Sequence, residues 1–433
     1  MGVESIYSRV QYTPLSTDPN LRARINKALD IAQDLPLKIS DTYPERSEDI
    51  YKKIFAIVHT NQPNPELEYK SILKEKTYLQ DMLVVLCSWG TNTTRTSVIK
   101  HAFERLSRMN PLPRIIFVEG STDGRESFEF VKDYDNVNYV RLDLRQDAFR
   151  NLFMKEILWN YGVQQMLKAY PDIKKICYLD ADVAFADQYS FQLIYNALDN
   201  YDVVSPMRGS YYAGNKPYAK KYKMMLSCGF CLNRRMTNKG WPGFGIALTT
   251  DFLFKRFKGE LPCTCCGLGD VLFWYIVSNG QVNKYNWFLP YGAHKLKPYL
   301  IPNVKIGYAN NVVMHFDHGP MSDRTYRVYS RLLTRSVKDP FKEFARIGVS
   351  TLLGWADTEE VRRYRYCLEN LLIFNRKDIK LTEPEDADQL FNWLMGITCK
   401  PPMKLRHSVF AVNGNVMPCA GVSIPRPNKI SEV

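Results

Sequence analysis

The sequence predicts an α/β fold built on a mostly parallel β-sheet. Short apolar runs alternate with helical patterns between residues 82 and 179, which is typical of β-α-β units joined by right-handed crossovers. The first run, Met82–Cys87, contains no polar residue, as expected for a strand buried on both faces of a parallel sheet. The composition, 45% apolar and 24% charged, is that of a globular protein and excludes collagen-like, disordered and disulfide-scaffold classes.

The elements of this core follow one another in a regular order. A helix is predicted at Arg95–Met109, and strands are predicted at Arg114–Val118 and Val137–Leu142. A second helix follows from about Phe149 to Tyr170, and a strand at Lys175–Leu179 comes next. Beyond that strand the alternation weakens into loops rich in Tyr, Gly and Cys up to about residue 320, and loops of such length are usually functional.

The 433 residues divide into three expected regions. Residues 1–80 are polar and interrupted by prolines, with one helix pattern that begins near Asp18, so a helical N-terminal extension is predicted. Residues 81–330 hold the α/β domain. Residues 331–433 are expected to form a helical C-terminal region and a tail, because the helical pattern lasts until Pro401-Pro402.

The sequence also bears on the compartment of the protein. The N-terminus has no apolar segment of the signal-peptide kind, and no run of about 18 apolar residues occurs, so we expect a cytoplasmic protein with no membrane span. The ten cysteines are then expected to be reduced thiols. A zinc site built from Cys228, Cys231, Cys263, Cys265 and Cys266 is the alternative, although its spacing is not a standard one.

The net charge of +13 is concentrated in one stretch, residues 208–258. It holds a single acid, Asp251, among aromatic residues such as Tyr211 and Trp241. Its eleven basic residues are Arg208, Lys216, Lys220, Lys221, Lys223, Arg234, Arg235, Lys239, Lys255, Arg256 and Lys258. Cations mixed with flat rings follow phosphates and stack on bases, so DNA is a predicted partner. The alternative is a solvated basic loop that helps to hold a diphosphate.

Two acidic residues follow the strand at 175–179 directly, in the order Asp180-Ala181-Asp182. On extended backbone the side chains at i and i+2 point to the same side, so the two carboxylates converge. Mg²⁺ and Mn²⁺ bind oxygen ligands, typically one or two carboxylates plus substrate phosphates. A metal site is therefore predicted, with an acidic turn as the alternative. An aspartyl-phosphate phosphatase is disfavoured, because Ala184 stands where that signature requires Thr or Val.

Several further segments occur in a characteristic order with this acidic pair. They are Phe153-Met154-Lys155-Glu156 with Asn160, Cys177–Phe185, Trp241-Pro242-Gly243-Phe244-Gly245, Gly267-Leu268-Gly269-Asp270, Met314-His315-Phe316-Asp317-His318-Gly319 with Arg324 and Tyr326, and Glu369–Asp378. With these segments, residues 83–378 resemble the nucleotide-sugar-dependent glycosyltransferases of the GT-A fold, in particular those of bacteriophages and other viruses. The resemblance implies an α/β GT-A domain with helical additions at both ends.

The resemblance implies a divalent metal ion, Mn²⁺ or Mg²⁺, and a nucleoside diphosphate sugar, expected to be a UDP-sugar. Asp180 and Asp182 would bind the metal, with His315 or His318 as a further ligand, and imidazole suits Mn²⁺ better than Mg²⁺. The alternative for the histidines is a structural role in a turn. Asp270 would act as the general base in an inverting reaction; alternatively, it only complements the dipole of the helix that it begins.

The resemblance also implies a set of residues that bind the donor. Ser88 lies at the end of the first strand, where such enzymes bind the nucleotide, and Arg95 would pair with the diphosphate. Glu119 stands in a segment, Val118–Gly124, where relatives carry two acids, so its role in reading the base is open. Lys155 and Glu156 are expected either to bind the donor or to form a solvated helix face.

The resulting hypothesis is a metal-dependent, inverting glycosyltransferase. An acceptor that is a hydroxymethylated base in DNA would account for both the viral resemblance and the basic stretch, and a viral enzyme would act in the host cytoplasm. The open alternatives are a carbohydrate or protein acceptor, a nucleotidyltransferase with the same sheet and metal carboxylates, and a non-catalytic nucleic-acid-binding module.

Overall fold

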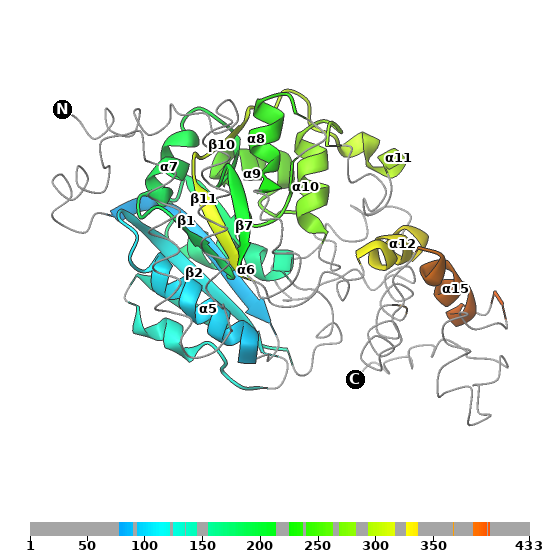
Figure 1. Cartoon of the computed structure of the whole chain (residues 1–433), viewed down its shortest axis with the longest axis horizontal. Helices are drawn as coiled ribbons and strands as arrows, with labels where there is room; N and C mark the ends of the chain where they lie inside the picture. The colour runs from blue at the N-terminus through cyan, green and yellow to red at the C-terminus, as the bar shows by residue number, and fades with distance from the viewer. Residues whose placement is uncertain are drawn as a thin grey trace, which may run out of the picture.

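The computed structural model describes residues 78–89, 93–121, 124–134, 136–144, 155–213, 225–236, 240–262, 268–282, 293–316, 326–336, 367, 384–395 and 397–398. A seven-stranded, mainly parallel sheet forms the centre of the fold (Figure 1), which confirms the predicted α/β class. The predicted N-terminal extension up to residue 77 and the tail beyond Pro401 lie outside the described residues.

The first half of the domain follows the predicted order of elements. In chain order these are β1 (Tyr78–Trp89), α5 (Thr93–Leu106), β2 (Leu112–Ser121), the 3-10 helix η1 (Glu129–Asp133), β3 (Val137–Asp143), α6 (Lys155–Ala169) and β4 (Lys175–Leu179). The bounds of β4 are those predicted from the sequence, and the other strands are one to six residues longer. The apolar runs thus predicted the strands well.

The second half is richer in structure than the sequence predicted. Its elements are β5 (Val183–Phe185), α7 (Ser190–Ala197), β6 (Val203–Ser205), β7 (Gly209–Ala213), β8 (Met225–Leu226), α8 (Cys228–Asn233), β9 (Gly245–Thr249), α9 (Thr250–Phe257), α10 (Gly269–Val277), α11 (Ala293–Leu296), η4 (Lys297–Tyr299), β10 (Ile306–Tyr308) and β11 (Val312–Phe316). The expectation of long loops was wrong here, because strands of two to five residues are too short to give a periodic pattern.

The strand order of the central sheet is β10-β6-β9-β4-β1-β2-β3. Every neighbouring pair is parallel except those of β9, which runs antiparallel to both β4 and β6. From β1 the chain first adds β2 and β3 on one side, and then returns to add β4 on the other side of β1. In open α/β sheets such a reversal leaves a crevice outside the carboxyl ends of the strands, where ligands bind.

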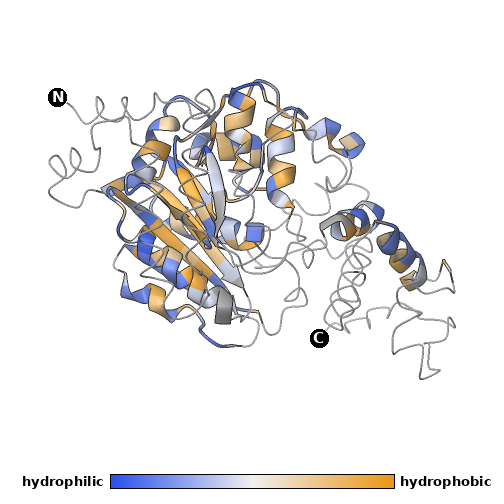
Figure 2. Ribbon diagram, viewed as in Figure 1, coloured by the Kyte–Doolittle hydropathy of each residue, from blue (hydrophilic) through white to orange (hydrophobic). Residues whose placement is uncertain are grey.

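Strand β1 is buried on both faces, which explains its unbroken apolar sequence. Leu83 and Val85 belong to a core that they share with α6 on one face of the sheet. Val84 and Leu86 belong to a second core that they share with α5 on the other face. The strands are accordingly coloured as hydrophobic in Figure 2, while α5 shows polar residues on its outer side. Each such buried side chain contributes about 1.5–3 kcal/mol of transfer free energy.

A smaller sheet, ordered β5-β11-β7-β8, lies next to the carboxyl end of β4. Strand β5 begins directly after Asp182 and pairs antiparallel with β11, so that His315 is opposite Val183. The guanidinium of Arg105 on α5 donates to the carbonyls of Phe185 and Ala186, at 3.0 and 3.2 Å, and ties β5 to the central layer. This register places the histidine strand beside the acidic pair.

The described part of the C-terminal region contains two helices. Helices α12 (Tyr326–Ser336) and α15 (Pro384–Leu394) lie side by side in Figure 1, and Arg331 binds Asp388 with two nitrogens at 2.9 Å. Leu332 and Leu390 are buried between them. Among the described residues, no helix is both long and apolar enough to cross a membrane.

Candidate functional site

Two of the predicted site residues lie at the reversal point of the sheet. Ser88 is close to the end of β1, and Asp180 follows the last residue of the neighbouring strand β4. Ser88 is fully buried, and its hydroxyl has no hydrogen-bond partner in the described part of the chain. Both residues therefore lie where an open α/β sheet binds its ligands.

Asp180 is held by both of its carboxylate oxygens. The ammonium of Lys155, the first residue of α6, lies 3.1 Å from Oδ1. The backbone N–H of Phe244 donates to Oδ2 at 3.2 Å, and the N–H of Asp180 donates to the carbonyl of Phe244 at 3.1 Å. A charge-assisted bond and a pair of backbone bonds thus fix the direction of this carboxylate.

Asp182 and His315 form a second buried pair. Asp182 is 4% exposed and His315 is 3% exposed, and Nε2 of the imidazole lies 3.5 Å from Oδ1 of the carboxylate. Two adjacent ligands at about 2.1 Å from one octahedral ion lie about 3 Å apart, so this spacing suits a shared divalent cation. His318 lies outside the described residues, and the described ones contain no group of three or more His, Cys, Asp or Glu side chains that could hold a metal.

Asp270 lies in the first turn of α10, where the sequence placed it. Its Oδ1 accepts a hydrogen bond from the backbone N–H of Val271 at 2.8 Å, and its Oδ2 lies 4.0 Å from the ammonium of Lys155. Burial raises the pKa of Asp270, and the nearby positive charge of Lys155 opposes the rise. A carboxylate with a raised pKa is a better proton acceptor than an ordinary aspartate.

Lys155 lies between the two aspartates. Burial alone would lower the pKa of this ammonium, but the carboxylates of Asp180, Asp270 and Glu156 outweigh burial, so the pKa is raised and the group stays charged. The thiol of Cys87 on β1 contacts the carbonyl of Lys155 at 3.6 Å and helps to fix the start of α6. The alternative expectation, a solvated helix face for Lys155 and Glu156, is wrong because both residues are buried.

Glu156 is the least satisfied group of this cluster. It is 2% exposed, and neither carboxylate oxygen has a hydrogen-bond partner among the residues that the structure describes. It packs directly on Gly269, where an added Cβ would lie 2.3 Å from Oε1. Burial raises the pKa of Glu156 to about 7, against the opposing charge of Lys155. A buried polar group without a partner is uncommon and calls for an explanation.

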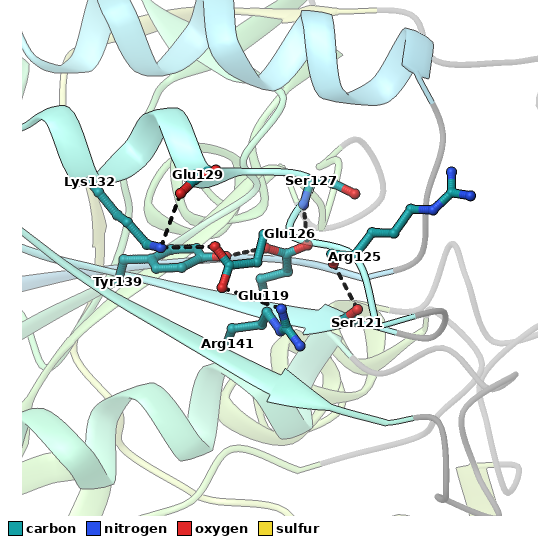
Figure 3. A network of polar contacts seen from close by, with 9 residues as sticks. All are labelled: Glu119, Ser121, Arg125, Glu126, Ser127, Glu129, Lys132, Tyr139 and Arg141. Carbon is teal, nitrogen blue, oxygen red and sulfur yellow. Dashed lines mark hydrogen bonds and ion pairs between the residues drawn. The ribbon is translucent and has the colours of Figure 1, made fainter.

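Glu119 has a different environment (Figure 3). The hydroxyl of Tyr139 donates to Oε2, and the backbone N–H of Ser127 donates to Oε1 at 2.8 Å. The ring of Tyr139 lies under the ammonium of Lys132, 5.3 Å from the ring centroid. Burial, together with the bond to Glu119, raises the pKa of Tyr139. The two oxygens of Glu119 thus connect β3 and the segment after β2 to β2 itself.

The remaining predicted residues have separate outcomes. Arg95 lies near the start of α5, but its side chain is not among those that the structure describes. Within the basic stretch, Arg208 is 1% exposed and is therefore a core residue, which corrects its inclusion in a phosphate-binding surface. Lys216–Lys223 and Lys239 lie outside the described residues. Arg234, Arg235, Lys255 and Arg256 are exposed at the ends of α8 and on α9.

The cysteines give only a partial answer about zinc. Cys228 and Cys231 are buried in α8, and both are in the thiol form rather than in a disulfide. Cys263, Cys265 and Cys266 lie outside the described residues, so a zinc site built from these five cysteines stays a prediction.

One part of the site was not predicted as functional. Phe244 contacts Asp180 through its backbone, and its ring centroid lies 4.8 Å from that of the His315 imidazole. Its φ angle is +80°, a left-handed conformation that is unusual for a bulky residue. The sequence Trp241–Gly245 was visible only as a segment of family resemblance, and nothing in the local pattern indicates contact with residues about 65–70 positions away.

Comparison with known proteins gives a limited result. No protein-family model and no curated protein matches the chain. Among solved structures, the mannosyltransferase PcManGT from Pyrobaculum calidifontis, in complex with GDP-Man and Mn²⁺, is 12% identical, covers 75% of this chain and 79% of its own, and has a TM-score of 0.31. TarS 1–349 of S. aureus is 10% identical over 73% of this chain and 92% of its own, with a TM-score of 0.32. Its complex with UDP is 9% identical over the same shares, with a TM-score of 0.32.

Proposed function

We propose that the protein is a metal-dependent glycosyltransferase that moves a sugar from a nucleoside diphosphate sugar to an acceptor hydroxyl. The observation that carries the proposal is the position of Lys155, whose ammonium lies 3.1 Å from Asp180 and 4.0 Å from Asp270. The ammonium of Lys155 thus lies next to both the predicted metal-binding carboxylate and the predicted base, although 90 residues separate the two in the sequence. Their common place is the carboxyl edge of the sheet, at its reversal point.

The donor set suits Mn²⁺ or Mg²⁺. Asp180 and Asp182 would supply carboxylate oxygens and His315 an imidazole nitrogen, while substrate phosphates would complete the coordination. The bound ion would neutralise the charge that develops on the departing diphosphate. Lys155 is a permanent cation next to the same carboxylate, so it would contribute positive charge at the diphosphate end of the donor.

Asp270 would perform the proton transfer of the reaction. As the acceptor oxygen bonds to the anomeric carbon and the bond to the diphosphate breaks, the acceptor proton passes to a carboxylate oxygen of Asp270. Attack from the face opposite the diphosphate would invert the anomeric centre. The Oδ1 atom of Asp270 is held by the N–H of Val271, and this bond leaves Oδ2 for the proton.

The identity of the donor and the acceptor rests on the sequence. A UDP-sugar is the proposed donor, with Ser88 and Arg95 at the nucleotide. Glu119 is a weaker candidate for contact with the base, because both of its oxygens already accept hydrogen bonds within the protein. The proposed acceptor is a hydroxymethylated base in DNA, with a carbohydrate or a protein hydroxyl as the alternatives.

A donor screen tests the reaction class. The full chain is incubated with Mn²⁺ and a panel of UDP- and GDP-sugars, and the released nucleotide is identified. Release of the nucleoside diphosphate supports glycosyl transfer, and release of pyrophosphate instead indicates a nucleotidyltransferase. Asp270→Asn should lower the transfer rate about 10²–10⁴-fold, the usual contribution of a general base. No turnover of any donor, with DNA binding that does not depend on Asp180 and Asp182, would favour a binding module.

A salt titration tests the DNA acceptor. Neutralising Lys220, Lys221 and Lys223 together removes up to three phosphate contacts, each of which contributes about 0.9 to the slope of log affinity against log salt concentration. The slope for duplex DNA should therefore flatten by up to about 2.7. An unchanged slope, or no DNA binding at low salt, would favour a carbohydrate or protein acceptor.

A further inference from the structure

Four consecutive residues, Trp241–Phe244, contact Asp180 and His315 and approach Asp270 closely; we call them the WPGF segment. They come from the connection between α8 and β9, and none of them is a candidate ligand or base. Trp241 and Phe244 stack on each other, with centroids 6.4 Å apart. The carbonyl of Pro242 accepts a hydrogen bond from the indole N–H of Trp274 in α10, at 3.0 Å.

The Phe244 end of the segment holds the metal side of the centre. Its backbone N–H and C=O each bond to Asp180, at 3.2 and 3.1 Å, so the carboxylate and its own backbone are fixed together. The ring of Phe244 packs against the imidazole of His315, with centroids 4.8 Å apart. Phe244 is 5% exposed, so both contacts are made inside the protein.

The Gly243 end of the segment holds the side of the predicted base. A Cβ added at Gly243 would lie 3.3 Å from Oδ2 of Asp270 and 3.0 Å from Nε1 of Trp241. The glycine therefore lets the backbone approach closely to the carboxylate oxygen that faces Lys155. The Trp274 bond to Pro242 joins this end of the segment to the body of the same helix.

The backbone of Phe244 is strained, and the strain coincides with these contacts. A φ of +80° is unfavourable for a bulky residue, and such residues persist where the surrounding structure over-determines them, often at active sites. A glycine would adopt this angle without cost. The aromatic ring at this position is therefore held against a local preference, and it contacts both His315 and Trp241.

We infer that the WPGF segment sets the distance between the metal-binding carboxylate and the general base, with Phe244 as the positioning residue on the metal side and Gly243 on the base side. The inference rests on the proposed function. It assigns to these residues no contact with substrate; they act through Asp180, His315 and Asp270. Residues that orient metal ligands typically change metal affinity 10- to 100-fold when they are replaced.

The test on the metal side measures binding of Mn²⁺ alone to the full chain, from the loss of the free-Mn²⁺ signal in electron paramagnetic resonance. Phe244→Val places a β-branched residue at φ +80° and should break the backbone clamp, so Mn²⁺ affinity should fall about 10-fold or more. Phe244→Gly keeps the angle and loses only the ring, so the loss should be smaller. Phe244→Tyr keeps both and should bind within about twofold of the parent.

A matched control separates positioning from general strain. Asn303 has a φ of +59° and lies in the exposed loop before β10. Asn303→Val introduces the same kind of strain away from the centre, and should lower the melting temperature while leaving Mn²⁺ affinity unchanged. If Phe244→Val is poorly folded, the Mn²⁺ affinities of Phe244→Gly and Phe244→Tyr decide the outcome. Glycine relieves the strain, so weaker Mn²⁺ binding by Phe244→Gly than by Phe244→Tyr reports the lost ring contact, and equal binding would contradict the inference.

The test on the base side uses Gly243→Ala. The new methyl group should displace Asp270 or Trp241 by a few tenths of an ångström, which lowers kcat for transfer about 10-fold or more and leaves Mn²⁺ affinity within about twofold. Parental Mn²⁺ affinity in Phe244→Val, or a parallel loss of kcat and Mn²⁺ affinity in Gly243→Ala, would overturn the inference. A parent protein that binds no Mn²⁺ would overturn the proposed function itself and the inference with it.

Discussion

Two carboxylates near the carboxyl edge of the sheet, the buried Glu119 on β2 and the partly buried Asp180 after β4, have opposite environments. Glu119 is bonded by two neutral donors, the hydroxyl of Tyr139 and the backbone N–H of Ser127. Tyr139 lies on the neighbouring strand β3 and Ser127 lies in the segment after β2, so these contacts favour an architectural role for this carboxylate. In the described part of the chain, no charged side chain hydrogen-bonds to Glu119.

Asp180 belongs to a charged cluster. One ammonium, that of Lys155, interacts with the carboxyl groups of Asp180, Asp270 and Glu156. Full ionisation leaves this cluster with more negative than positive charge, in a region where Lys155 and Glu156 are buried and the two aspartates are partly buried. Buried charge of one sign is costly unless it is paired or bound to a metal. The comparison teaches that position at the sheet edge does not make a carboxylate functional; the charge balance of its neighbours does.

The largest expected effect comes from the metal side of this cluster. Asp182→Asn keeps the shape of the side chain and removes its charge, so Mn²⁺ binding and sugar transfer should both fall below detection. Glu119→Gln is the matched control, a change from carboxylate to amide at an equally buried position, and it should keep Mn²⁺ binding. Transfer at the parental rate by Asp182→Asn at limiting Mn²⁺ would exclude this metal site.

The histidine is expected to contribute less than the carboxylate. His315→Gln should weaken Mn²⁺ binding about 10-fold or more, because the imidazole lies 3.5 Å from Asp182 and suits the same ion. His318→Gln should have a smaller effect. Mn²⁺ titrations of the two variants, with circular dichroism to check folding, measure the difference. Equal and negligible effects would give both histidines a structural role.

Glu156 offers a test through pH. Its pKa is about 7 in the folded protein, above the ordinary value of 4.5. The contribution of Glu156 to the free energy of unfolding is therefore fully present below about pH 4.5 and is lost as the pH rises through about 7. At 1.36 kcal/mol per pKa unit, the loss amounts to about 3 kcal/mol. Glu156→Gln cannot ionise, so relative to the parent it should gain up to about 3 kcal/mol between pH 4.5 and pH 8.5.

Urea unfolding of the parent and of Glu156→Gln at both pH values measures this gain. The amide is as buried as the carboxyl group, so any packing defect appears at both pH values and cancels in the comparison. The same stability difference at pH 4.5 and at pH 8.5 would contradict the raised pKa.

The sequence was a good guide to the first half of the fold, because those elements are long and strongly patterned. The run Met82–Cys87 is apolar without interruption since its side chains enter two cores, and Lys175–Leu179 is buried throughout. The short strands between Val183 and Phe316 were missed. Their pairing is decided by tertiary contacts, such as the bonds of Arg105 to the end of β5, and these are not visible in a local pattern.

For the candidate site, the sequence indicated candidate residues but not the partners that they contact. The Asp180-Ala181-Asp182 motif and Asp270 follow from strand and helix ends, which are local features. Burial of Lys155 and Glu156 could not be predicted, because two charged residues at the start of a helix normally face water. Phe244 was missed for a related reason, since its left-handed backbone is stabilised by Asp180, a residue 64 positions earlier in the chain.

The smallest expected effects concern Glu119, and they decide whether it is architectural or reads the base of the donor. Glu119→Gln turns one amide N–H₂ toward a hydrogen-bond donor, and Tyr139→Phe removes one of the two donors; each change should cost about 1–3 kcal/mol of stability. If Glu119 acts only by bracing β3 and the Ser127 segment, both variants should shift the donor KM alike and only slightly, because they disturb the same network. Urea unfolding and KM for UDP-sugar hydrolysis measure the two quantities. A KM that rises about 10-fold in Glu119→Gln and stays at the parental value in Tyr139→Phe would instead indicate that Glu119 binds the nucleotide. Glu119 would then differ from Asp180 in that it binds the sugar nucleotide, whereas Asp180 binds the metal.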